Sequence, residues 1–148
     1  MDIELPPDFK EFLRLLADKG VEYLLIGGYA VAFHGFPRAT ADMDIWIRKN
    51  SDNAQRMVEV LLAFGFETHE ISPALFLSDN CSVRMGIPPM QIEVSTSISG
   101  VSFRECYDGR VVVDVEGIPV SIIGLEDLKL NKKAAGRHRD LDDLEHLP

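Results

Sequence analysis

Residues 21–48 read VEYLLIGGYAVAFHGFPRATADMDIWIR, and this stretch decides the fold. Residues 21–26 form an apolar run rich in β-branched and large side chains, which predicts a buried strand. Gly27-Gly28 closes that run in a tight turn, and a short helix is expected over residues 29–33. Residues 42–48 alternate polar and apolar side chains, which is typical of a second strand. A strand, a turn, a helix and a further strand are therefore predicted in succession.

Two carboxylates are expected on one face of the second strand. Successive side chains of a strand point to opposite faces, so Asp42 and Asp44 share one face while Met43, Ile45 and Ile47 face the core. At an effective dielectric of about 20, two carboxylates about 4 Å apart repel by about 4 kcal/mol. Water between them, a proton on one of them or a bound divalent cation would relieve that repulsion. A D-x-D pattern alone is also typical of a solvated edge face.

Two further features favour a site over a solvated edge. Gly27-Gly28 lies at a strand-to-helix junction, where backbone N–H groups are free and a side chain would block the approach of a phosphate. Glu93 lies between Ile92 and Val94 in a later predicted strand, so it could add a third carboxylate. By itself, a glycine pair is more often only a turn, and a single glutamate is more often a surface residue. Together they indicate one site.

The rest of the sequence mixes helical and strand patterns. Apolar spacing predicts helices around residues 9–16 and 53–64, and a shorter one over 101–107. Strands are expected at residues 66–71, 74–77, 82–85 and 91–95, and as a hairpin, 110–115 with 118–122, joined by a two-residue turn. A helical segment follows over about 124–147, where Asp140 to Asp143 could cap a final short helix. We expect one domain spanning residues 1–148, since a chain of this length buries roughly 70% of its unfolded surface.

Composition narrows the class of protein. The formal charge of −9 argues against a broad nucleic-acid-binding surface, which needs an excess of basic residues. The start of the chain lacks the pattern of a signal peptide and no stretch is long enough to span a membrane, so we expect a soluble cytoplasmic protein without membrane contact. Cys81 and Cys106 have no metal-ligand spacing and are expected to be reduced thiols. The histidines form no HxH or HExxH pair, so zinc is not expected.

Basic residues are concentrated near the C-terminus. Lys129, Lys132, Lys133, Arg137 and Arg139 make up five of the 15 basic residues. The first three share one face of the predicted helix, which is either a solvated face or a clamp for a triphosphate. Arg38, four residues before Asp42, could steer a phosphate or pair with the acidic cluster. Trp46 could stack on a base, but burial under a helix is the simpler interpretation.

The order Gly27-Gly28, Asp42-Met43-Asp44 and Glu93 resembles the glycine-pair, D-x-D and third-carboxylate pattern of the nucleotidyltransferase superfamily. With His34-Gly35, Arg38 and Thr40, the first block more narrowly resembles small bacterial proteins related to AbiEii-type toxin nucleotidyltransferases. Lys132 to Arg137 and Asp140 to Leu144 resemble the ending of the same group. The resemblance covers residues 8–147, and residues 27–44 are its most specific part.

The resemblance implies an α/β (α+β) fold, in which a mixed β-sheet is packed by helices and a short helical segment ends the chain. It further implies Mg²⁺ (or Mn²⁺) on Asp42, Asp44 and Glu93, and a nucleoside triphosphate against Gly27-Gly28. Arg38, Lys129, Lys132, Lys133 and Arg137 are the candidate phosphate-binding residues.

The implied reaction transfers a nucleoside monophosphate to a hydroxyl group. The acceptor, whether tRNA, protein or small molecule, is left open, because the third acid is Glu rather than the commoner Asp, Gly-Gly replaces Gly-Ser, and a larger acceptor-holding helical domain is not expected. The alternative is a noncatalytic nucleotide-binding module, such as a toxin–antitoxin partner. Three carboxylates that repel one another favour the enzyme.

Overall fold

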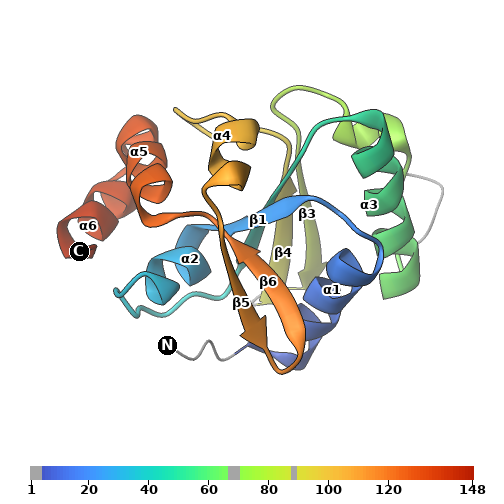
Figure 1. Cartoon of the computed structure of the whole chain (residues 1–148), viewed down its shortest axis with the longest axis horizontal. Coiled ribbons are helices and arrows are strands. Elements are labelled where there is room, and N and C mark those ends of the chain that lie inside the picture. Colours follow the sequence, from blue (N-terminus) through green and yellow to red (C-terminus); the bar gives the residue numbers. More distant parts are fainter. Residues whose placement is uncertain (1–4, 67–70, 88–89) are drawn as a thin grey trace.

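The computed structural model describes residues 5–66, 71–87 and 90–148. This part of the chain forms one six-stranded sheet in the order β3-β4-β2-β1-β6-β5, with helices on both faces (Figure 1). The strands are β1 (Tyr23–Ile26), β2 (Met43–Ile47), β3 (Ser82–Ile87), β4 (Met90–Ser95), β5 (Val111–Val115) and β6 (Ile118–Ile122). The helices are α1 (Pro7–Asp18), α2 (Gly27–Phe33), α3 (Ser51–Phe64), α4 (Phe103–Asp108), α5 (Leu125–Ala135) and α6 (His138–His146), with a 3-10 turn, η1 (Pro73–Phe76).

The sheet is mixed, as the resemblance implied. β2 runs antiparallel to β1 and parallel to β4, whereas β1 runs parallel to β6. The two hairpins, β3–β4 and β5–β6, are antiparallel and supply the two edges. β1 and β2 therefore lie at the centre of the sheet, where the stretch of sequence between residues 21 and 48 anchors both the core and the site.

One face of the sheet carries the main apolar core. Helix α1 buries Phe9, Phe12, Leu13 and Leu16 at the spacing that the sequence predicted. Helices α1 and α3 contact each other and lie together to the right of the sheet in Figure 1. The alternation of β2 is confirmed on this face, because Met43, Ile45 and Ile47 are all fully buried.

The opposite face of β2 is divided between a packed part and an open part. Trp46 is only 2% exposed, and its ring meets the edge of Phe103 in α4 at a centroid distance of 5.0 Å. The interpretation of Trp46 as a residue buried under a helix is therefore confirmed. Asp44, two residues earlier on the same face, lies in the open part, toward which α5 and α6 extend.

Three local predictions were wrong or need correction. The strand expected over residues 74–77 is the 3-10 turn η1, in which Pro73 occupies the first turn and favours helical rather than extended backbone. The glycine pair does not precede α2 but forms its first two residues. The expected cap of α6 is confirmed for Asp140 but lies inside the helix: α6 begins at His138, and Oδ2 of Asp140 in its first turn accepts a hydrogen bond of 3.2 Å from the backbone N–H of Arg137.

Two other expectations concern a strand over residues 66–71 and the absence of a membrane span. Phe66 and Ile71, the ends of another expected strand, are not in a strand, and residues 67–70 between them lie outside the described residues. Among the residues that the structure describes, no helix combines the length and the apolar character needed to cross a membrane.

Candidate active site

The centre of the candidate site is a pair of carboxyl groups on neighbouring strands. Asp44 of β2 and Glu93 of β4 are direct partners across the parallel ladder, so their side chains leave the sheet on the same face. The two carboxyl groups are close enough to share a hydrogen bond. Asp42 lies just before the start of β2 and adds a third negative charge nearby.

This crowding changes the acidity of Asp44. Its burial, followed by the negative charges of Glu93 and Asp42, raises the pKa of Asp44 from 3.8 to about 7. The hydrogen bond to Glu93 acts in the same direction, because it stabilises the protonated form, whereas the ammonium group of Lys132 opposes the rise. At neutral pH Asp44 therefore carries a proton for much of the time.

Glu93 is held in place from the edge strand β3. The hydroxyl group of Ser82 donates a hydrogen bond of 2.5 Å to Oε1 of Glu93, and Nη2 of Arg84 lies 3.6 Å from Oε2. These contacts fix the carboxylate of Glu93 beside that of Asp44.

The glycine pair shapes the floor of the site. Gly27 has a φ of +66°, and a Cβ built there would lie 2.1 Å from Oδ2 of Asp44. A Cβ on Gly28 would lie 2.6 Å from Oγ1 of Thr40. From the sequence we expected glycine here because a side chain would block a phosphate, but the side chains of Asp44 and Thr40 already require glycine at both positions.

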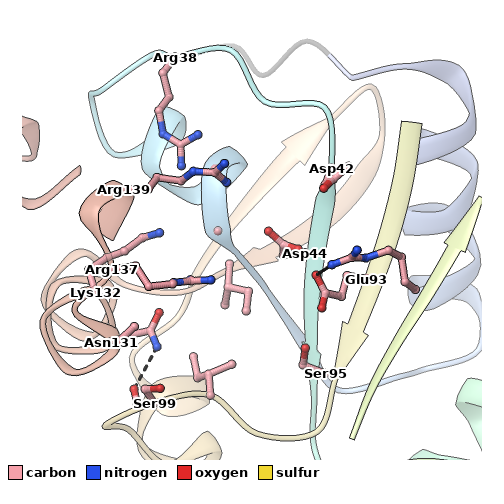
Figure 2. A pocket seen from close by; sticks show the side chains of 16 residues that line it. Arg38, Asp42, Asp44, Glu93, Ser95, Ser99, Asn131, Lys132, Arg137 and Arg139 are labelled. Carbon is pink, nitrogen blue, oxygen red and sulfur yellow. Dashed lines mark hydrogen bonds and ion pairs between the residues drawn. The ribbon is translucent and has the colours of Figure 1, made fainter. Parts of the chain in front are cut away.

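A pocket of about 510 Å³ opens between this strand face and the C-terminal helices. One side is the acidic wall, made of Asp42, Asp44 and Glu93, and the other is the basic wall, made of Arg38, Lys132, Arg137 and Arg139 (Figure 2). Ser95, Ser99 and Asn131 line one end, where Nδ2 of Asn131 donates a hydrogen bond to the carbonyl of Ser99. The pocket therefore separates opposite charges across its width.

The sequence of residues 7–147 matches the family described as "Nucleotidyltransferase of unknown function (DUF6036)". The chain belongs to this nucleotidyltransferase family. The prediction of the superfamily is confirmed, whereas the narrower relation to AbiEii-type toxins stays a prediction. No curated protein sequence matches the chain.

Solved structures show the same fold. A protein of Thermotoga maritima, solved as a proposed nucleotidyltransferase, is 16% identical over 93% of this chain and 88% of its own, with a TM-score of 0.62. The lincosamide antibiotic adenylyltransferase LnuA, solved with lincomycin, is 16% identical over 96% and 95%, with a TM-score of 0.61. ANT(2″)-Ia, solved with adenylyl-2″-tobramycin, is 11% identical over 93% and 83%, with a TM-score of 0.58. These similarities confirm the predicted fold.

Most of the predicted site residues of this nucleotidyltransferase line the one pocket. They are Gly27, Gly28, Arg38, Asp42, Asp44, Glu93, Lys132 and Arg137. Lys129 and Lys133 are not among the lining residues, and the ammonium group of Lys129 donates to the carbonyl of Pro148 instead. The sequence-based prediction that these two lysines bind phosphate is not tested by the structure, and their absence from the lining leads us to expect less from them than from Lys132.

Other lining residues were missed by the sequence argument. Arg139 belongs to the basic stretch that the sequence identified, but its position across from the acidic wall depends on how α6 packs. Arg84 faces the pocket because its strand pairs with β4 in the register that sets it opposite Glu93. Ser95, Ser99 and Asn131 carry no distinctive spacing. None of these positions could be assigned to the pocket without the fold.

The side chains of the acidic wall are not arranged as a complete metal-binding site. Within the described ranges, no group of three His, Cys, Asp or Glu side chains is arranged to hold a metal ion. The close pair is Asp44 with Glu93, and Asp42 stands apart from it just before the start of β2 (Figure 2). The wall therefore offers two adjacent carboxyl groups and a third within the same pocket.

Proposed function

We propose that this protein is a divalent-metal-dependent nucleotidyltransferase, which transfers a nucleoside monophosphate from a nucleoside triphosphate to a hydroxyl group. The observation that carries the proposal is the separation of charge across one pocket. A metal–triphosphate complex has a cationic centre and an anionic tail, and the acidic and basic walls complement these two parts. The family to which the chain belongs supports the same class of reaction.

The acidic wall has the chemistry that a Mg²⁺ or Mn²⁺ ion requires. Both ions prefer carboxylate oxygens. Burial is the largest cause of the raised pKa of Asp44, and the repulsion by Glu93 and Asp42, which a cation would offset, adds to it. Asp44 and Glu93 would hold the ion, with Asp42 as the third ligand. When bound, the metal would neutralise the charge that develops on the transferring phosphoryl group.

The basic wall would bind and orient the phosphate tail. Lys132 and Arg137 interact electrostatically with the acidic wall. The charge of Lys132 lowers the pKa of Asp44. Hydrogen bonding and attraction to Asp140 raise the pKa of Arg137, and Asp44 and Glu93 add to that effect. Cationic donors fixed before the substrate arrives need no reorganisation during the reaction, which is how positioning groups accelerate phosphoryl transfer.

We further propose a small molecule as the hydroxyl acceptor. LnuA and ANT(2″)-Ia are described as an antibiotic adenylyltransferase and an antibiotic-resistance factor, and both were solved with small molecules bound. The net charge of −9 disfavours an RNA acceptor, because RNA binding relies on many phosphate contacts. tRNA and protein acceptors, and a toxin–antitoxin partner, are the alternatives that the assay below includes.

The test is a transfer assay with labelled nucleotides. Each α-labelled nucleoside triphosphate is incubated with the protein, Mg²⁺ or Mn²⁺, and in turn an aminoglycoside and lincosamide set, total tRNA and a protein extract. Transfer by the parent that is abolished by chelator and by Asp44→Asn is the expected result. Asp18→Asn is the matched control, because Asp18 is exposed at the end of α1 and loses the same charge. Triphosphate binding without transfer to any acceptor class would instead favour the noncatalytic module.

A further inference from the structure

We propose that Asp143 is a positioning residue, which holds Arg38 and Lys132 in place on the basic wall. This inference rests on the proposed function, because it assigns the two cations to the phosphate tail of the substrate. Asp143 lies in α6, Lys132 lies in α5, and Arg38 lies in the segment between α2 and β2. One carboxylate would thus fix two pocket residues that come from different parts of the fold.

The contacts of Asp143 are made away from water. Nε of Arg38 donates to Oδ1 at 2.8 Å, and Nη2 of Arg38 donates to Oδ2 at 3.1 Å, which makes the pair bidentate. Nζ of Lys132 lies 3.1 Å from Oδ2 of the same carboxylate. The side chain of Asp143 is 0% exposed and that of Lys132 only 6%. Both carboxylate oxygens of Asp143 are therefore committed to cations of the pocket.

A second buried carboxylate completes the arrangement. Asp140 accepts a hydrogen bond of 2.7 Å from Nε of Arg137 and one of 3.2 Å from Nζ of Lys132. Burial opposes its ionisation, but these hydrogen bonds outweigh burial and hold the pKa of Asp140 below its usual value. The cluster therefore contains three cations, Arg38, Lys132 and Arg137, and two anions, which leaves one positive charge in excess beside the pocket.

The cations keep donors for a ligand. An ammonium group has three N–H donors, and Lys132 directs two of them to Asp140 and Asp143. Arg38 uses Nε and Nη2 for Asp143, and its Nη1 lies over the glycine pair, 3.3 Å from where a Cβ of Gly28 would be. Nη1 of Arg38 therefore lies beside the floor of the pocket, where the proposed function places the triphosphate, and Lys132, which also lines the pocket, keeps one donor.

An effect of the charge of Asp143 alone predicts a different change in triphosphate affinity from a positioning role. Buried ion pairs often contribute little net stability, so burial alone does not show what the pair is for. Replacing Asp143 by Asn removes a negative charge near the phosphate tail. If charge alone mattered, triphosphate affinity would rise. If Asp143 positions Arg38 and Lys132, affinity falls, because both cations lose the partner that fixes them.

The test compares Asp143→Asn with Asp142→Asn. Asp142 lies on the same helix, is exposed, and pairs only with His146 among the described residues, so it loses the same charge without touching the basic wall. Each magnesium nucleoside triphosphate is titrated into the parent by calorimetry, and the tightest one, together with its nucleoside, is titrated into the folded variants. Asp143→Asn should weaken triphosphate binding about tenfold, as expected for misplaced charge-assisted donors. Nucleoside binding, and both affinities of Asp142→Asn, should stay within about twofold of the parent.

A double-mutant cycle shows whether Asp143 acts through its partner. With Arg38→Gln already in place, Asp143→Asn should cost clearly less affinity than it costs in the parent. Should Asp143→Asn fail to fold, Arg38→Lys provides the same test, since it keeps the charge but loses the bidentate contact, and it should weaken triphosphate binding as much as Arg38→Gln does.

The outcomes separate the two proposals. Unchanged or stronger triphosphate binding in Asp143→Asn, or in Arg38→Lys if the first variant does not fold, would overturn the positioning role while the proposed function stands. If the folded parent binds none of the magnesium nucleoside triphosphates, both the proposed function and this inference are overturned.

Discussion

Replacing Asp44 by Asn should stabilise the metal-free protein at neutral and alkaline pH. Burial, then the charges of Glu93 and Asp42, raises the pKa of Asp44 from 3.8 to about 7. One pKa unit equals about 1.4 kcal/mol, so a rise of about three units corresponds to roughly 4 kcal/mol of stability lost when Asp44 is ionised. Asn has nearly the same shape, carries no charge and can donate a hydrogen bond to Glu93.

The pH dependence gives this prediction a second, independent signature. Between about pH 4 and pH 7, the folded chain keeps a proton on Asp44 that the unfolded chain has released. The free energy of unfolding of the parent should therefore fall as pH rises through this window, by up to about 4 kcal/mol, and stay level above it. Asp44→Asn should lack most of this fall, so the two proteins should be similar at pH 4 and differ most at pH 8.

Urea denaturation in the presence of a chelator, at several pH values from 4 to 8, measures the difference. Asp18→Asn should follow the parent, because Asp18 is exposed. Saturating Mg²⁺ or Mn²⁺ should raise the stability of the parent at pH 8 and leave Asp44→Asn unchanged, since the cation relieves the same repulsion. Equal stability of parent and Asp44→Asn at pH 8 in chelator would refute the reasoning about the carboxyl pair.

Three further predictions follow from individual contacts. Gly27→Ala should destabilise the protein by at least about 2 kcal/mol more than Gly20→Ala, measured by thermal melting, because both positions have positive φ but only Gly27 is obstructed by a carboxylate. Lys132→Gln should weaken triphosphate binding about tenfold in calorimetry, whereas Lys133→Gln, which alters no lining residue, should change it less than twofold. Asn53→Ala should cost about 2 to 4 kcal/mol in urea denaturation, because its buried side chain makes three hydrogen bonds to the backbone of Glu22, just before β1, and Arg48, just after β2; equal stability would show that water replaces them.

The acidic half of the site could be predicted from sequence because it depends on local rules. Alternation along a strand places Asp42 and Asp44 on one face, and the same rule orients Glu93 between two apolar neighbours. The sequence could not give the register that sets Asp44 opposite Glu93, since that pairing joins strands from distant parts of the chain. The glycine pair was singled out as a place where a phosphate could approach the backbone, whereas the group that lies against Gly27 in the structure is the carboxyl group of Asp44.

The basic half depended on contacts that no local pattern reveals. Arg38 and Asp143 are 105 residues apart, and the sequence left open whether Arg38 binds phosphate or an acidic partner. Asp140 and Asp143 were expected only to cap the last helix, and nothing in the sequence predicted their burial, because buried aspartates are rare unless cations pair with them. Helical spacing grouped Lys129, Lys132 and Lys133 on one face, yet only Lys132 is buried beside these aspartates. Which lysine reaches the pocket is decided by how α6 packs on α5.

The two halves together argue that metal and triphosphate should bind this protein as a unit. Without a metal, the acidic wall repels the phosphates that the excess charge of the basic wall attracts. A divalent cation bound to the acidic wall would turn this repulsion into attraction and leave the attraction by the basic wall unchanged, so it should strengthen triphosphate binding. By linkage, the triphosphate should strengthen metal binding by the same factor. We expect this coupling to pass through Asp44, because the charges of Glu93 on its own wall and of Lys132 on the basic wall both act on it. Removing its charge should therefore weaken the coupling between the two ligands more than it weakens triphosphate binding in the absence of metal.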